Sequence, residues 1–320
     1  MAAPLPREDR TAAGLLLMAL AMVLFTGIDT SAKTLMLAGL APLQVVFVRY
    51  AGHFAMCLLV YLPQEGMSAF RSAAPRRQLL RAVLLLGSTA LNFTALKYLP
   101  ITLTTTIMFA APIVITLLAI PILGEKVGPH RIVAVCVGFV GVLVTIRPWD
   151  VSFEPEVFFT LGALLCSAGY FIMTRMLAGI DSNATAQLWG AGLATLVLAP
   201  FGIAAWVAPD SGLTVAVMLV IGVLGALGHI AATMAHRLAD ASVLAPMVYT
   251  QILTAAVAGV LVFDTWPTVW TLGGGAIIVA SGLYIWHRER QRSGLKLRAM
   301  RASPYGPRRQ TEQDQGRKDG

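Results

Sequence analysis

The stretch ITLTTTIMFAAPIVITLLAIPILGE, residues 101–125, decides the fold class. It carries no basic residue and a single acid at its end, and as a helix it is long enough to cross a hydrocarbon layer of roughly 30 Å. Similar runs, too long and too uniform for membrane strands, fill the chain. They lie at 12–31, 42–63, 79–99, 101–123, 130–147, 155–177, 184–207, 213–236, 240–263 and 268–287. We therefore predict an all-α integral membrane protein with ten transmembrane helices.

Composition supports a protein that is surrounded by lipid. Hydrophobic residues make up 57% of the chain, charged residues 12%, and the mean hydropathy is +0.74. A soluble domain spends about a quarter of its residues on charged side chains. The cysteines, Cys57, Cys136 and Cys166, lie far apart inside apolar runs. Their spacing predicts neither a disulfide framework nor a metal site.

The distribution of basic residues predicts the orientation, because cytoplasmic loops are enriched in Lys and Arg. If the N-terminus is cytoplasmic, the inner connections carry Arg71, Arg76, Arg77, Arg81, Lys126, Arg131, Arg175 and Arg237. We expect residues 1–11 and the tail, 288–320, in the cytoplasm and the protein in a bacterial inner membrane. The tail is basic and poor in apolar residues, so we expect it to be disordered. It acts as a topology anchor or as a tether to anionic lipid. Because the tail accounts for most of the high pI, the charge does not indicate nucleic-acid binding.

The chain also shows an internal repeat. Residues 101–147 and 240–288 share one order of features: an apolar helix with early hydroxyls, an acid, a short polar turn and a glycine-rich closing helix. Aligning Glu125 with Asp264 gives a period of 139 residues. We predict two five-helix repeats, 12–147 and 148–287. An odd number of crossings inverts the second repeat in the membrane, and inverted repeats favour alternating access by a transporter.

Several segments together resemble the EamA-type transporters of the drug/metabolite transporter superfamily. They are FVRY at 47–50, ALKYLPITLTTTIMFAAPI at 95–113, LGE at 123–125 and GVLVTIRP at 141–148. The resemblance spans roughly residues 12–287. It implies a ten-helix permease with two EamA-like repeats that moves small metabolites, amino acids or drugs without ATP. The second half departs from the pattern, with Asp264 in place of the usual Glu and Gln251 where the first repeat has Pro112.

Ionisable residues inside the apolar runs are candidates for function, because charge is expensive at membrane depth. Asp29 and Lys33 stand four residues apart on one helix face and can pair. Arg49 lies at a similar depth and can neutralise Asp29. We interpret Asp29, Lys33 and Arg49 as a charged gate or as a structural ion pair. Arg49 is also a candidate contact for a substrate carboxylate.

Two histidines lie within the same apolar runs. An unperturbed imidazole titrates in the physiological range, so His53 and His229 are candidates for proton coupling. The alternative is that burial leaves each ring neutral, as an ordinary hydrogen-bonding group of the core.

Uncharged polar residues near the presumed centre are candidates for a substrate cavity. Hydroxyl and amide groups in hydrocarbon need partners, so they gather at helix contacts or around a wet site. The candidates for substrate binding are Asn92, Tyr98, Tyr170, Tyr249 and Gln251. Hydrogen bonding between helices is the alternative for each.

The sequence lacks a phosphate loop, HExxH, GxSxG and paired carboxylates within a span. We therefore predict no enzymatic activity and no cofactor. The predicted function is secondary transport of small metabolites or drugs across the inner membrane by alternating access. Its partners are a small-molecule substrate and membrane lipid, with a homodimer left open. The alternatives are a membrane scaffold or lipid-handling protein and, less favoured, an intramembrane enzyme.

Overall fold

All regular elements of the described residues are helices. The structure is a computed structural model. It describes residues 11–123, 129–147, 149–150, 154–177, 180–238, 247 and 249–302. This confirms the predicted all-helical class. Glu125 and Lys126, on which part of the repeat comparison and of the orientation depends, lie outside these residues.

Six described helices are long and apolar enough to cross a membrane. They are α1 (Thr11–Leu37), α2 (Pro42–Glu65, followed by the 3-10 turn η1, Gly66–Phe70), α3 (Pro75–Tyr98), α7 (Val157–Leu177), α8 (Asn183–Ala204) and α9 (Gly212–Leu238). The other helices are α4 (Ile101–Met108), α5 (Ala111–Leu123), α6 (Pro129–Ile146), α11 (Thr250–Phe263) and α12 (Val269–Ala302), whose apolar parts are shorter. Three long helices are thus followed by shorter ones, twice along the chain. The protein is a multi-pass membrane protein.

The predicted helix 101–123 is broken in the structure. Helix α4 ends at Met108, a turn follows at Phe109 and Ala110, and α5 begins at Ala111. Proline at position 112 explains the break, because proline has no N–H to donate to the carbonyl of Met108 and its ring clashes with that carbonyl in a regular helix. Helix α11 begins at Thr250, which aligns with Ala111 in the repeat. The first part of the predicted helix 240–263 lies mostly outside the described residues.

Helix α12 continues through Ala302, beyond the predicted end at residue 287. Residues 288–302 are therefore helical in the structure, which differs from the disorder we expected. Arg, Glu, Gln, Leu, Lys and Ala dominate this segment, and all of them have high helix propensity. The low apolar content of this segment indicates that it buries no hydrophobic core of its own, but such a segment can still continue the helix that precedes it. The rest of the tail, 303–320, lies outside the described residues.

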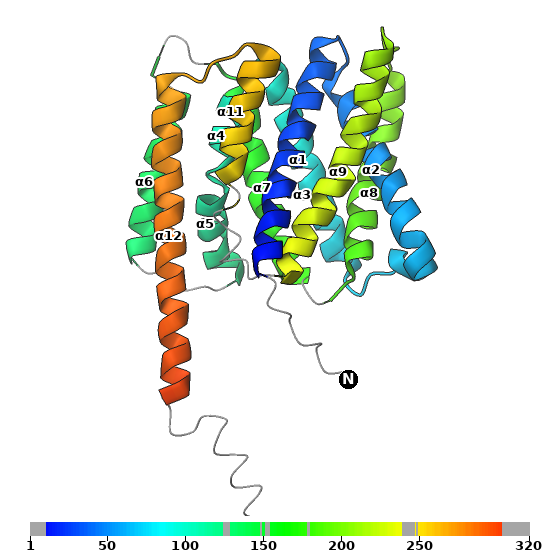
Figure 1. The fold of residues 1–320 in the computed structure, drawn as a ribbon. Helices are drawn as coiled ribbons and strands as arrows, with labels where there is room; N and C mark the ends of the chain where they lie inside the picture. The colour runs from blue at the N-terminus through cyan, green and yellow to red at the C-terminus, as the bar shows by residue number, and fades with distance from the viewer. Residues whose placement is uncertain are drawn as a thin grey trace, which may run out of the picture.

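The helices run roughly parallel or antiparallel to one another in one bundle (Figure 1). Helix α1 packs against α9, α3 against α7, α2 against α8, and α6 against α12. The start of α1 and the end of α12 lie on the same side of the bundle (Figure 1). We call this the inner side and the opposite one the outer side. The largest buried apolar cluster includes Tyr50, Phe93 and Ile221 and joins α1, α2, α3, α8 and α9.

Helices α2 and α9 approach backbone to backbone at a pair of glycines. A Cβ built on Gly222 would lie 2.6 Å from the Cα of Gly52. Small residues permit such close helix contacts in membranes, where packing replaces the hydrophobic effect as a driving force. The contact brings Arg49 and His53 of α2 against His229 of α9.

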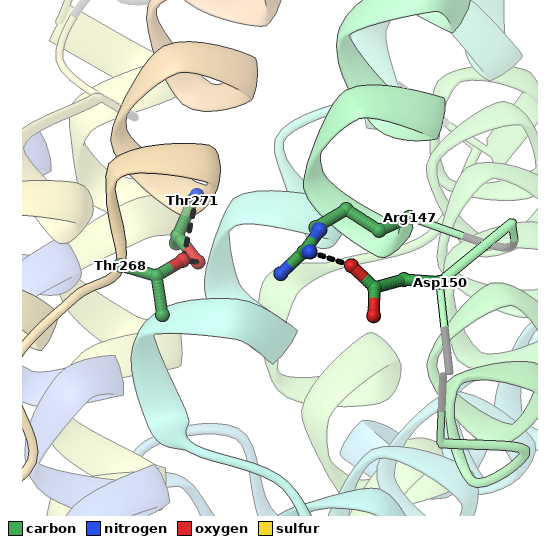
Figure 2. A network of polar contacts seen from close by, with 4 residues as sticks. All are labelled: Arg147, Asp150, Thr268 and Thr271. Carbon is green, nitrogen blue, oxygen red and sulfur yellow. Dashed lines mark hydrogen bonds and ion pairs between the residues drawn. The ribbon is translucent and has the colours of Figure 1, made fainter. Parts of the chain in front are cut away.

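The outer ends of α6 and α12 meet in a second polar contact (Figure 2). Arg147, which follows α6 with a positive φ of 52°, forms an ion pair with Asp150. Its guanidinium lies 4.9 Å from the ring centre of Trp270. The hydroxyl of Thr268 accepts a hydrogen bond of 3.1 Å from the backbone N–H of Thr271. The capping contact lies within the start of α12 and the ion pair within the end of α6, so the contact that joins the two helices here is that of Arg147 with the ring of Trp270.

Candidate functional site

The carboxylate of Asp29 is the centre of a polar cluster contributed by three helices. Asn92 of α3 donates its side-chain N–H to Oδ1 of Asp29 at 3.2 Å. Gln251 of α11 donates to Oδ2 at 3.5 Å. One turn along α1, the hydroxyls of Thr26 and Thr254 lie 2.6 Å apart. The structure thus brings Asp29, Asn92 and Gln251 together, and α11 reaches the cluster with its first turn.

These three side chains are only partly buried, although they lie well inside the bundle. The carbonyl oxygen of the Asn92 side chain has no hydrogen-bond partner among the described residues. In this orientation of the amide, its N–H faces the carboxylate of Asp29 and its oxygen is left without a donor. An acceptor left unpaired at this depth is a position where a ligand donor or a water is expected.

Lys33 lies one turn above Asp29 on α1. Its Nζ donates to the carbonyl oxygens of Leu96 and Leu99 at 3.1 and 2.6 Å. It also lies 5.5 Å from the ring centre of Phe263. Lys33 thus binds the outer end of α3 rather than Asp29. It borders an open hollow of about 740 Å³ at the outer side, together with residues 260–265 and Leu37.

Arg49 lies deep in the bundle, with 4% of its surface exposed. Its guanidinium donates to the Thr89 hydroxyl at 3.4 Å and contacts Nε2 of His229 at 3.2 Å. The ring centre of Tyr50 lies 4.5 Å from its central carbon. Arg49 also attracts Asp29 electrostatically. In the described part of the chain, however, the two side chains form no direct ion pair.

His53 and His229 face each other across the contact between α2 and α9. Their rings are stacked with centroids 5.4 Å apart and an angle of 12° between the planes. His53 is 1% exposed and lies beside the Gln187 side chain, although neither of its ring nitrogens meets hydrogen-bond geometry among the described residues. Because Arg49 is always a donor, Nε2 of His229 accepts the proton of their contact, which places the hydrogen of a neutral ring on Nδ1.

Arg81 was counted in the sequence analysis only among the basic residues of the inner connections and not among the candidate site residues. It is 4% exposed and donates to the hydroxyls of Thr174 and Tyr170 and to the carbonyl of Ala186 at 2.9, 3.0 and 3.0 Å. Its guanidinium carbon lies 4.8 Å from the ring centre of Tyr170. Arg81 thereby links α3 to α7 and α8. Its position inside the predicted span 79–99 was the signal that could have identified it.

The structure separates two tyrosine candidates from the Asp29 cluster. Tyr98 is 54% exposed at the end of α3, beside Lys97. Tyr249 lies directly before α11, with its ring 5.6 Å from that of Phe109. Its hydroxyl fills the space that a side chain on Gly282 would need. A mostly apolar cavity of about 420 Å³ lies nearby, between α4, α11 and α12.

The inner connections of the two halves are tied together by Asp181, between α7 and α8. Its carboxylate accepts hydrogen bonds from Ser72, Gln78 and the backbone N–H of Ala73 at 2.6, 2.8 and 2.8 Å. Partial burial raises the pKa of Asp181, but these three hydrogen bonds outweigh it and hold the pKa below its ordinary value. Nearby, the indole N–H of Trp189 donates to the carbonyl of Phe70 at 3.0 Å. The contacts close the inner side between α3 and α8.

We expect Asp181→Asn to lower the melting temperature of the purified protein at pH 7, by an amount that corresponds to about 1 kcal/mol for a partly exposed carboxylate. Because the folded-state pKa is depressed, the stabilisation is present above the unfolded pKa and is lost as the pH falls through the folded one. The difference from wild type should therefore shrink below about pH 4. Melting curves from pH 3 to 8 measure it. Asp264→Asn, which removes an exposed charge, is the control, and an equal loss there would refute the assignment.

Comparisons with known proteins agree with this architecture. The model of the EamA-like transporter family matches residues 12–147. The chain is 27% identical to the S-adenosylmethionine uptake transporter of Rickettsia prowazekii, over 78% of this chain and 84% of that protein. It is 30% identical to the riboflavin transporter of Rhizobium johnstonii, with coverage of 89% and 94%. The riboflavin transporter of Vibrio cholerae is 31% identical, with coverage of 80% and 86%.

A crystal structure with 19% sequence identity has the same fold, with a TM-score of 0.57 over 85% of this chain and 95% of the other. The relatives named above are transporters of small molecules, and none of them is named as an enzyme or a scaffold. The long apolar helices, the buried polar cluster and these likenesses lead to one conclusion. The chain belongs to the EamA-like transporter family and is a membrane transporter of small metabolites.

Proposed function

We propose that the protein takes up a small heterocyclic metabolite by alternating access, with Asp29, Asn92 and Gln251 as its binding site. The observation that carries the proposal is the meeting of these three side chains. Asp29 and Asn92 come from the first half of the chain and Gln251 from the second. In transporters built from repeats, the substrate binds at the interface of the repeats near the middle of the membrane.

Ten crossings in two inverted repeats, 12–147 and 148–287, are part of this proposal. The helix contacts support it. If α1 corresponds to α7 and α3 to α9, the packing of α1 on α9 becomes the packing of α7 on α3, and both contacts are present. The contacts of α2 with α8 and of α6 with α12 each map onto themselves. The repeated order of three long helices and then shorter ones has the same origin.

The substrate class follows from the donors and acceptors of the site and from the relatives. S-adenosylmethionine and riboflavin, the molecules named for the relatives, each contain a flat nitrogen heterocycle. A carboxylate flanked by two amides offers both acceptors and donors to the polar edge of such a ring.

We propose uptake because the S-adenosylmethionine relative is named as an uptake transporter, and the outer hollow is where this protein's substrate would enter. This hollow ends at Lys33, one turn above Asp29, while the Asp181 contacts close the inner side. We place the protein in an inner membrane with both termini in the cytoplasm, which agrees with the common side of α1's start and α12's end. Lys33 then acts as the outer gate, because it binds the last carbonyls of α3.

A proton gradient is the energy source we propose, and because Arg49 donates to His229 we take the stacked His53 and His229 as neutral groups of the core and not as the proton carriers. Uptake into proteoliposomes that does not respond to an imposed pH gradient would exclude proton coupling.

A scaffold function is the alternative to the whole proposal. It is supported by the many hydrogen bonds between helices but leaves the unpaired oxygen of Asn92 without a role.

The site is tested by single cysteines at positions 92 and 251. Cys136 and Cys166 are replaced by alanine, and Cys57 stays as an internal control because it is fully buried. We expect both new cysteines to react with a small water-soluble thiol reagent, while Cys57 stays unmodified. Saturating riboflavin or S-adenosylmethionine, used as probes, should slow the reaction.

Mass spectrometry of the labelled protein measures the rates. Inertness of both cysteines would favour the scaffold and contradict the proposal. Labelling that neither probe slows would exclude these two compounds as ligands of the site. Saturable uptake of one of them into proteoliposomes is the corresponding result for transport.

A further inference from the structure

Among the described residues, the buried positive charge exceeds the buried negative charge. Arg49 and Arg81 are each 4% exposed, and within the described part of the chain neither forms an ion pair. Asp29 is near Arg49 and offsets its charge in part. Among the described residues Arg81 forms no ion pair, and the carboxylate of Asp181 is bound to Gln78, one turn earlier on α3. An uncompensated guanidinium inside a membrane protein is expensive and marks a functional position.

We call four basic residues inside the bundle the basic cluster: Arg49, His53, Arg81 and His229. Arg49 contacts His229, and His229 stacks on His53. Arg81 contacts none of the other three among the described residues and instead binds α7 and α8 toward the inner side. Gln187 and Thr233 bridge α8 and α9 beside the cluster, with 3.3 Å between amide and hydroxyl.

Each guanidinium is held by neutral groups in the same manner. Arg49 lies over the ring of Tyr50 and donates to Thr89, and Arg81 lies over the ring of Tyr170 and donates to Thr174. A tyrosine ring and a threonine hydroxyl orient a guanidinium without neutralising it. The positive charge is therefore fixed in direction but remains available to an anion.

Both arginines also retain donors. A guanidinium carries five N–H groups. Arg81 uses three of them on Thr174, Ala186 and Tyr170. The Nε of Arg49 has no partner among the described residues. A Cβ on Gly190 would lie 3.4 Å from Cδ2 of Leu85 and 4.0 Å from Nη1 of Arg81, so α8 packs closely beside the guanidinium at this glycine.

We propose that the basic cluster binds an anionic group of the transported metabolite, a carboxylate or a phosphate, with Arg81 as the principal contact. An oxyanion supplies the charge that the cluster lacks and accepts the donors that it retains. Asp29 binds the heterocycle of the same molecule toward the outer side. The inference deepens the proposed function and rests on it for the identity of the anion's carrier, but anion binding is measured without transport.

The experiment compares riboflavin with riboflavin 5′-phosphate, which differ only in the anionic group. Affinities come from the melting temperature of the full-length protein in detergent at constant ionic strength, because a ligand of the native state raises it by mass action. We expect the phosphate ester to bind about tenfold more tightly than riboflavin, because it gains one charge-assisted hydrogen bond with the guanidinium. Arg81→Gln should abolish the difference, and Arg81→Lys should keep part of it.

Arg76→Gln is the matched control, because Arg76 is exposed near the start of the same helix. It should retain the full difference. Equal affinities in the wild-type protein, or an equal loss in Arg76→Gln and Arg81→Gln, would overturn the inference. If Arg81→Gln does not fold, Arg81→Lys is the deciding variant. A reduced difference in affinity supports Arg81 as the principal contact, and an undiminished difference overturns that assignment.

Inorganic phosphate and acetate, tested alone, distinguish the two anion types. Stabilisation by either anion that Arg81→Gln removes supports the cluster even if neither flavin binds, in which case only the proposed substrate class fails. Flavin binding at Asp29 without any dependence on Arg81 gives the opposite result, since the proposed function then stands and the anion site fails.

Discussion

Asp29→Asn should reduce substrate uptake about 100-fold while the protein still reaches the membrane. The substitution keeps the shape of the side chain but replaces one carboxylate oxygen with an N–H₂ group. At least one of Asn92 and Gln251 would then face a donor instead of an acceptor. Loss of hydrogen bonds to a charged group costs about 1.5–3 kcal/mol each, and about 2.7 kcal/mol corresponds to a factor of 100.

Initial rates of uptake into proteoliposomes, normalised to the amount of reconstituted protein, give the measurement. Asp29→Glu, which keeps the charge one methylene further from the helix, should retain more activity than Asp29→Asn. Tyr98→Phe is the control, because Tyr98 is exposed and distant from the cluster. Wild-type rates in Asp29→Asn would remove Asp29 from the binding site.

Gly222→Ala should destabilise the bundle by about 3 kcal/mol or more. The added methyl group can be accommodated only if the backbones of α2 and α9 move apart. The added Cβ would lie 2.6 Å from the Cα of Gly52 and 3.0 Å from its carbonyl carbon. No rotamer change relieves a contact with main-chain atoms. The same displacement moves Arg49 and His53 away from His229.

The melting temperature in detergent and the monodispersity of the purified protein measure this effect. Gly273→Ala is the matched control, since a Cβ at Gly273 meets nothing within 4 Å. Alanine is the better helix former, so this control should be neutral or slightly stabilising. If Gly222→Ala behaves like Gly273→Ala, then α2 and α9 are not in close contact.

The sequence predicted the helices well because the bilayer imposes a length and an apolar composition that each run shows on its own. Runs such as 42–63 and 213–236 match α2 and α9 within a few residues. The break after Met108 was open to prediction as well, since Pro112 stands in the sequence. The apolar content of the whole run favoured one continuous helix, but proline affects the backbone regardless of how apolar its neighbours are.

The candidate site could be predicted only as residue types. The position of Asn92 inside a span indicated a partner, but not that Asp29 and Gln251 would be that partner, because the contacts join residues far apart in the chain. Spacing on one helix suggested that Lys33 would pair with Asp29. The structure instead directs Lys33 to the carbonyls of Leu96 and Leu99, which belong to another helix. Such choices depend on tertiary packing.

Helix α12 has a practical consequence for determining further structures. Its 34 residues span about 51 Å at 1.5 Å per residue, which exceeds the hydrocarbon layer by roughly 20 Å. The excess projects from the inner side as a continuous helix (Figure 1). A small helical marker protein fused in register after Ala302 would inherit that direction. Electron-microscopic images of this otherwise featureless 34.1 kDa particle could then be aligned on the marker.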